Sequence, residues 1–283
     1  MITSSGLIRR KDIRDKGYNH ARIFGAPAPL SLPKAGIGRK PLAVYDQQVT
    51  NFCTAFATAA ASSYQEGIPL SPEFQVAKTG QVVGKPILNG ADLRDALKST
   101  ILFGSIAQKD SPYSLENNGT KISNWYEWPE ELTQKALEHV KSAYYDVKSG
   151  PYDTFDNIRS ALWQAKDKNG VVIVGTPWYE AWNTPVQGVV SMPPFGAKTY
   201  LAHAWAIIDF TDEYLIAQLS QGESFGDKGL LYFPREVINF AFKEDWSLAF
   251  ILRDKEDQTS WLLAAYRVAL GMFYRIQNQL KLV

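Results

Sequence analysis

An uninterrupted alanine-rich segment, residues 51–65 (NFCTAFATAAASSYQ), constrains the fold of this chain more than any other feature. It contains neither Gly nor Pro and is dominated by a residue of high helix propensity, so we predict a buried helix there. Asn51 is a residue type that often caps helix N-termini, and we expect it to cap this helix. Cys53, the only cysteine of the chain, then lies in the first turn.

The character of the sequence changes near residue 170. Before that point, start signals or amphipathic spacing predict helices beginning at Pro72, after Asp92, over 130–141 and over 154–166. After it, short apolar runs between turn residues predict strands at 171–174, 203–210, 214–218, 229–233 and 248–252. A helical first half followed by a β-rich second half indicates an α+β fold.

Charge and cysteine content exclude several classes of function. The 283 residues include 30 Lys and Arg against 29 Asp and Glu, so we expect no nucleic-acid or membrane partner. A single cysteine excludes an intramolecular disulfide and a cysteine-based zinc site, and we expect no metal and no cofactor. The N-terminus has no apolar region of the secretory type, which favours a cytoplasmic protein or one assembled into a particle.

One pair of residues could perform nucleophilic chemistry. A thiol at a helix N-terminus is stabilised as the thiolate, and a neighbouring histidine can complete the pair. Of the three histidines, His203 begins an apolar strand and is the strongest candidate base, whereas His139 lies in a charged helical stretch and His20 near the N-terminus. Position alone leaves the alternatives open that Cys53 is a small buried apolar residue and His203 a structural histidine.

The segment from Tyr45 to Phe56 (YDQQVTNFCTAF) resembles the active-site segment of papain-like cysteine peptidases. Further elements similar to this family follow in the family's order: Leu70–Phe74, Asn89-Gly90-Ala91, Ser111-Pro112-Tyr113, His203-Ala204 and the glycine-bearing run 221–229. Taken together, these matches are closest in style to disulfide-poor bacterial or phage members of the family.

The resemblance implies a papain-like two-lobe fold over residues 28–253. It places a helical lobe with the cysteine-bearing helix at about 46–150 and a β-rich, barrel-like lobe at about 151–253. Residues 1–27 would form an N-terminal arm, and residues 254–283 a C-terminal helical extension. Only 52 residues precede Cys53, so a large inhibitory propeptide is not implied.

The resemblance also implies roles for individual residues. Cys53 would attack a peptide carbonyl, and His203 would hold the proton and deliver it to the leaving amine. The side chain of Gln47 would stabilise the oxyanion together with the Cys53 backbone. Asn89, Gly90 and Ala91 would form the edge along which a peptide or protein substrate lies.

One departure puts the activity in doubt. Where the family has an asparagine that orients the histidine, this chain has Leu219, which cannot accept a hydrogen bond from an imidazole. Gln218 or Gln221 could take over that role. Three functions therefore stay open: a peptidase, a catalytically impaired papain-fold protein within an assembly such as a phage virion, and an acyl transferase or amidase.

The C-terminal residues beyond Arg253 lie outside the resemblance. The spacing of apolar residues predicts a helix over 260–280 with a broad apolar face. Such a face needs a partner, which would be either the chain's own lobe or another protein, including a second copy of this chain.

Overall fold

The computed structural model describes residues 7–8, 29–114, 128–199 and 201–254. The α-helices are α2 (Cys53–Glu66), α3 (Pro72–Val83), α4 (Leu93–Phe103), α6 (Glu130–Ala136), α7 (Thr154–Gln164) and α8 (Arg235–Ala241). The strands are β1 (Lys141–Asp146), β2 (Val172–Trp178), β3 (Leu201–Phe210), β4 (Tyr214–Gln218), β5 (Leu230–Pro234) and β6 (Leu248–Asp254). Short 3-10 turns are η1 (Pro29–Ser31), η2 (Gln108–Asp110), η3 (Leu137–His139), η4 (Lys166–Lys168) and η5 (Glu180–Asn183).

The six strands form one antiparallel sheet in the order β1-β6-β2-β3-β4-β5. The five strands predicted from the second half of the sequence are all present, so the α+β prediction is confirmed. Strand β1 was not predicted, although it lies within the range expected for the helical lobe and pairs with β6. Its sequence, KSAYYD, contains only the short run Ala-Tyr-Tyr, and every residue after Lys141 is half-buried at the edge of the sheet.

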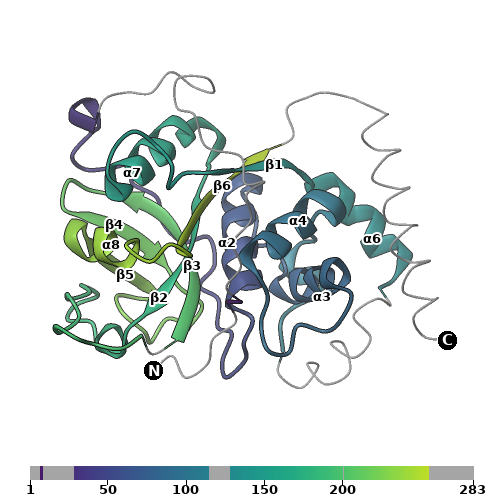
Figure 1. Cartoon of the computed structure of the whole chain (residues 1–283). Helices are drawn as coiled ribbons and strands as arrows, with labels where there is room; N and C mark the ends of the chain where they lie inside the picture. Colours follow the sequence, from purple (N-terminus) through teal and green to yellow (C-terminus); the bar gives the residue numbers. More distant parts are fainter. Residues whose placement is uncertain (1–6, 9–28, 115–127, 200, 255–283) are drawn as a thin grey trace.

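Two cores lie on the two faces of the sheet, because successive side chains of a strand point to opposite faces. The β-lobe core packs one face against α7 and α8 and includes Phe155, Val174, Trp178, Trp205, Leu219, Phe233 and Ile238. The inter-lobe core packs the other face against α2 and α4 and includes Cys53, Phe56, Leu97, Ile173, Ala204 and Phe250. Figure 1 shows α2 between the sheet and the remaining helices of the first lobe.

Helix termini test the capping predictions residue by residue. The helices predicted to begin at Pro72 and after Asp92 do so: Ser71 accepts a hydrogen bond from the Phe74 N–H and caps α3, and Asp92 accepts one from the Arg94 N–H and caps α4. The prediction that Asn51 caps α2 is wrong, because the N-cap residue is Phe52, which has no side-chain acceptor. The side chain of Asn51 instead donates to the backbone oxygen of Leu88, 3.3 Å away.

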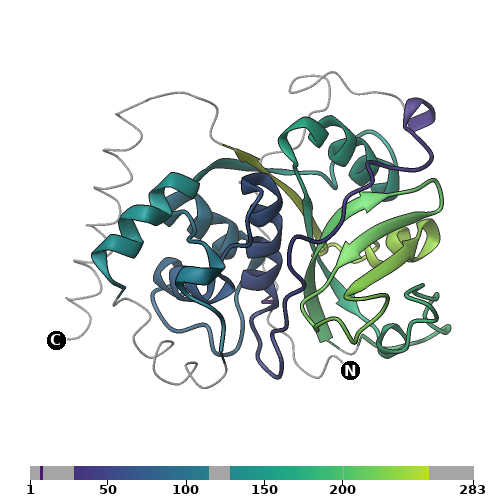
Figure 2. The ribbon, with the colours of Figure 1, turned by 180° about the vertical axis from the view of Figure 1, so that it is seen from behind.

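The segment that precedes α2 runs along the β lobe and then between the two lobes (Figure 2). The carboxylate of Asp209 anchors its first part by accepting hydrogen bonds from the backbone N–H groups of Ile37, Gly38 and Arg39, at 2.8, 2.6 and 2.7 Å. Farther along, the backbone of Asp46 pairs with that of Gln221. This second contact carries the chain from the β lobe into the start of α2.

Two predicted elements fall largely or wholly outside the described residues. Of the N-terminal arm, residues 1–27, the structure describes Leu7 and Ile8, and the helix predicted over 260–280 lies outside the described part. Among the described helices, none has the length and apolar character needed to cross a bilayer.

Candidate active site

Cys53 is the first residue of α2, and its side chain has no exposed surface. The first N–H groups of a helix have no partner within the helix, and the N-cap Phe52 offers no side-chain acceptor to them. The position therefore favours negative charge at or near the thiol. Cys53 belongs to the inter-lobe core together with Ala202 and Ala204, the two neighbours of His203 on β3.

The side-chain amide of Gln47 is held at both of its ends. Its Oε1 accepts a hydrogen bond from the Ser220 hydroxyl at 2.6 Å, and its Nε2 donates to the Thr50 backbone oxygen at 2.7 Å. The hydroxyl of Tyr113 donates to the Gln47 backbone oxygen at 3.2 Å. Because a primary amide has two N–H groups, this orientation uses one of them and fixes the direction of the other.

His203 lies near the start of β3 and is completely buried. Its ring meets the ring of Trp178 edge to face, with 5.2 Å between centroids. Burial lowers the pKa of His203 to about 3, because the apolar surroundings disfavour the imidazolium. Within the described residues its Nδ1 makes no hydrogen bond, whereas its Nε2 lies 3.3 Å from the side-chain nitrogen of Gln221.

The structure distinguishes the three residues considered for orienting the histidine. Leu219 is buried in the β-lobe core. The amide of Gln218 accepts from the Tyr64 hydroxyl at 2.9 Å and donates to the Ala43 oxygen at 2.7 Å, so it is engaged on the α2 side. Only Gln221 of the three approaches His203. A half-turn of its amide would present Oε1, which has no partner in the described part of the chain, to the ring.

The predicted substrate edge lies between α3 and α4. Gly90 adopts a backbone φ of +88°, which a residue with a side chain rarely adopts, and its N–H donates to the Ile87 oxygen at 2.7 Å. Asn89 is exposed, whereas Ala91 is buried and pairs its backbone with Leu7. The remaining histidines lie elsewhere: Nδ1 of His139 is 2.7 Å from the Glu66 carboxylate, and His20 is outside the described residues.

Sequence reasoning gave no role to three residues that shape this site. Ser220 and Thr50 hold the Gln47 amide, and Trp178 packs on the His203 ring. Ser220 could have been noticed because it lies between Leu219 and Gln221, two of the three residues considered for orienting the histidine. Trp178 meets His203 because β2 pairs with β3, which the sequence alone did not show. Thr50 lies only three residues after Gln47, so its contact belongs to the turn before α2.

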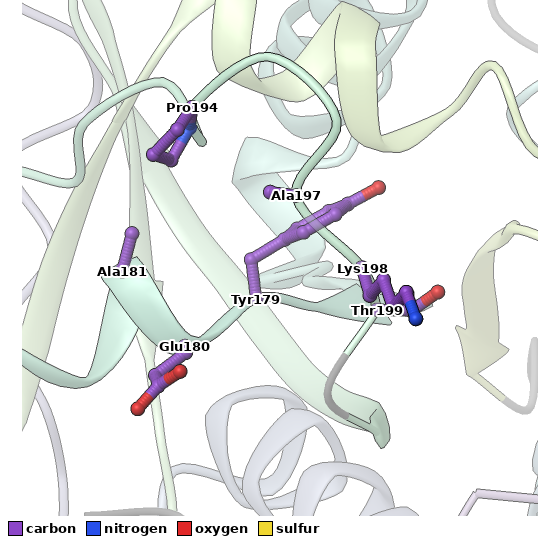
Figure 3. A pocket seen from close by; sticks show the side chains of 7 residues that line it. All are labelled: Tyr179, Glu180, Ala181, Pro194, Ala197, Lys198 and Thr199. Carbon is purple, nitrogen blue, oxygen red and sulfur yellow. The ribbon is translucent and has the colours of Figure 1, made fainter.

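A pocket of about 400 Å³ lies in the connection from β2 to β3 (Figure 3). It is lined by Tyr179, Glu180, Ala181, Pro194, Ala197, Lys198 and Thr199. Tyr179 directly follows Trp178, so the pocket begins one residue away from the tryptophan that contacts His203. Across the described part of the chain, no cluster of three or more His, Cys, Asp or Glu side chains could hold a metal ion.

Comparisons with known proteins identify the fold. No family model and no curated protein sequence matches this chain. Among solved structures, xylellain, a cysteine protease from Xylella fastidiosa, is 18% identical and covers 90% of this chain and 97% of its own, with a TM-score of 0.69. Procathepsin B S9 from Trypanosoma congolense is 12% identical and covers 89% of this chain and 87% of its own, with a TM-score of 0.62. The bromelain protease from Ananas comosus is 15% identical and covers 75% of this chain and 94% of its own, with a TM-score of 0.54. The helical lobe, the sheet and these likenesses together show that the chain has the papain-like two-lobe α+β fold.

Proposed function

We propose that this protein hydrolyses peptide bonds as a cysteine peptidase, with Cys53 as nucleophile, His203 as base and acid, and Gln47 as oxyanion donor. The observation that carries the proposal is the segment Ser220–Gln221. Ser220 fixes the amide of Gln47, and the next residue places its side-chain amide 3.3 Å from His203. This two-residue segment therefore contacts both the proposed oxyanion donor and the proposed base.

The proposed reaction uses these groups in two steps. The Cys53 thiolate attacks the substrate carbonyl, and the tetrahedral oxyanion accepts hydrogen bonds from the second N–H of Gln47 and from the Cys53 backbone. His203, protonated by the thiol, gives its proton to the leaving amine. Water, deprotonated by His203, then hydrolyses the thioester and releases the acid and the thiol. Gln221 would hold the imidazolium through its amide oxygen.

The charge state of the pair depends on solvent access. In the buried environment seen here the pKa of His203 is about 3, so the ring is neutral near pH 7. Transfer of the thiol proton to the ring would create two opposite charges that stabilise each other. We therefore expect the charged, reactive pair to form when the site is open to water.

The test is the pH dependence of Cys53 alkylation by iodoacetamide, followed by intact mass. Alkylation takes place in the open form, where in the wild type the ion pair keeps the thiolate populated, so the labelling rate should change less than about tenfold between pH 8.5 and pH 6. In His203→Ala an ordinary thiol with a pKa near 8.5 should lose roughly 100-fold over that range. The readout for each protein is the ratio of its labelling rate at pH 8.5 to its labelling rate at pH 6. Steric cover of the thiol is common to both proteins and does not alter the comparison of the two ratios.

Equal ratios in the wild type and His203→Ala would contradict the proposal. The alternative is a catalytically impaired papain-fold protein. The burial of Leu219 in the β-lobe core favours it, because the position at which papain-like peptidases carry the orienting asparagine is then purely structural. The protein would then be a papain-fold component of a larger assembly, with residues 260–280 as its contact to a partner. Loss of that assembly on removing residues 254–283 would support the alternative.

A further inference from the structure

The turn that holds the amide of Gln47 depends on support from outside itself. The Gln47 Nε2 donates to the Thr50 backbone oxygen at 2.7 Å, and the Thr50 N–H and hydroxyl donate to the Gln47 backbone oxygen at 3.2 and 2.6 Å. Between these residues, Gln48 has a backbone φ of +55°, in the left-handed region that is unfavourable for a residue with a side chain. Val49 at the tip of the turn is 73% exposed. The shape of the turn is therefore set by the segments that contact its base.

Tyr113 contacts this turn from the helical lobe. Its hydroxyl lies 3.2 Å from the Gln47 backbone oxygen and 3.0 Å from the Thr50 hydroxyl. The phenolic group thus touches both ends of the turn, although Tyr113 lies 63 positions after Thr50 in the sequence. Ser220 holds the same amide from the β lobe through its Oε1. The direction of the Gln47 amide is therefore fixed from both lobes.

The ring of Tyr113 also contacts the helix that carries the nucleophile. It meets the ring of Phe56 edge to face, with 4.8 Å between centroids and an interplanar angle of 85°. Edge-to-face pairs prefer a defined geometry. Phe56 is 1% exposed and lies three residues after Cys53 in α2, so its position follows that of the first helical turn. One side chain therefore holds the start of α2 and the Gln47–Thr50 turn relative to each other.

We propose that Tyr113 is a positioning residue that keeps the second N–H of Gln47 aimed at the oxyanion formed when Cys53 attacks a carbonyl. It touches neither the substrate nor the reacting atoms, and it acts through the Gln47–Thr50 turn. The effect on reactivity rests on the proposed peptidase function, whereas the ordering of the Gln47 amide does not. Because stabilisation of an oxyanion depends steeply on donor placement, loss of the Tyr113 hydroxyl should slow acylation of Cys53 and leave its alkylation unchanged.

The test compares two small reagents that modify the same sulfur atom. In the ester p-nitrophenyl acetate the thiolate attacks the carbonyl carbon, a C–S bond forms, the carbonyl oxygen carries the negative charge in the intermediate, and p-nitrophenolate leaves. Iodoacetamide forms a C–S bond and expels iodide without an oxyanion. The readout is the ratio of the acetylation rate to the alkylation rate of Cys53 at one pH, followed by intact mass and peptide mapping. Exposure and charge of the thiol affect both reactions, so this ratio isolates the oxyanion step.

In Tyr113→Phe this ratio should fall about tenfold, and in Gln47→Ala about 100-fold. Tyr45→Phe is the matched control, because its ring also meets Phe56 edge to face, at 6.1 Å, whereas its hydroxyl lies 2.9 Å from that of Ser63, toward the other end of α2. It should keep the wild-type ratio. Adding Tyr113→Phe to Gln47→Ala should change nothing further, because the tyrosine acts through that amide. A wild-type ratio in Tyr113→Phe when Gln47→Ala lowers it, or a full further loss in the double variant, would overturn the proposal.

The orientation itself is measured by nitrogen-15 relaxation of the Gln47 side-chain amide in the same full-length proteins. Its order parameter should drop from about 0.85 to below about 0.6 in Tyr113→Phe and stay at the wild-type value in Tyr45→Phe. An amide that is equally ordered in all three proteins would overturn the assignment. If Cys53 is not acetylated, or Gln47→Ala keeps the wild-type ratio, while the amide responds as expected, the oxyanion role fails and the positioning of the amide by Tyr113 stands.

Discussion

Burial of His203 should make the stability of this protein depend on pH in a specific way. The folded-state pKa is about 3, against an ordinary value of 6.5, and the cause is removal of the ring from water. A depressed pKa means that the folded state binds fewer protons than the unfolded state, so stability falls as the pH falls below 6.5. Each unit below that value costs about 1.4 kcal/mol, and the loss between pH 7.5 and pH 5 is about 2 kcal/mol.

The assay is urea unfolding at several pH values between 7.5 and 5, for the wild type and for His203→Gln. The other titrating groups are common to both proteins, so the difference between the two slopes isolates His203. We expect the wild type to lose about 2 kcal/mol more than the variant over this range. Stability is expected to fall with pH as long as the site is covered, because Nε2 of His203 then faces the uncharged amide of Gln221.

Two results would refute this reasoning. Equal slopes would mean that His203 is solvated in the folded protein and titrates normally. A wild type that gains stability relative to the variant as the pH falls would mean a raised pKa, as in a thiolate–imidazolium pair that persists in the folded ground state. Either result would show that the buried, neutral ring is not the dominant form.

Three substitutions test the remaining contacts. Gln221→Leu removes the polar partner of His203, so the alkylation rate at pH 6 should fall at least tenfold while the rate at pH 8.5 changes little. Leu219→Asn, which introduces the asparagine that papain-like peptidases carry at the corresponding position, should destabilise the protein by about 2–4 kcal/mol in urea unfolding without faster alkylation, because the amide enters the apolar β-lobe core. Glu66→Gln should cost about 3–5 kcal/mol, because it leaves the fully buried ammonium group of Lys141 without its carboxylate. The same carboxylate raises the pKa of His139, so in Glu66→Gln the NMR titration of that ring should move toward 6.5.

The sequence determined most local elements of this protein, with the exceptions of β1 and the N-cap of α2. An alanine-rich run without Gly or Pro produced α2 with Cys53 at its first residue, and Ser71 and Asp92 formed the caps that their residue types favour. The apolar runs after residue 170 became strands at the expected places. These features depend on contacts within a few residues, so the pattern of neighbouring residues is enough to predict them.

Tertiary structure decided which side chains meet. Gln218 and Gln221 were equivalent in the sequence, but the strand direction turns Gln218 toward α2, and pairing with Asp46 brings Gln221 to His203. The same holds for Leu7, which is one apolar residue among many until its backbone meets Ala91. Gln218 and Ala43, for example, are 175 positions apart in the sequence, and contacts of this kind follow from the register of the sheet and the meeting of the two lobes.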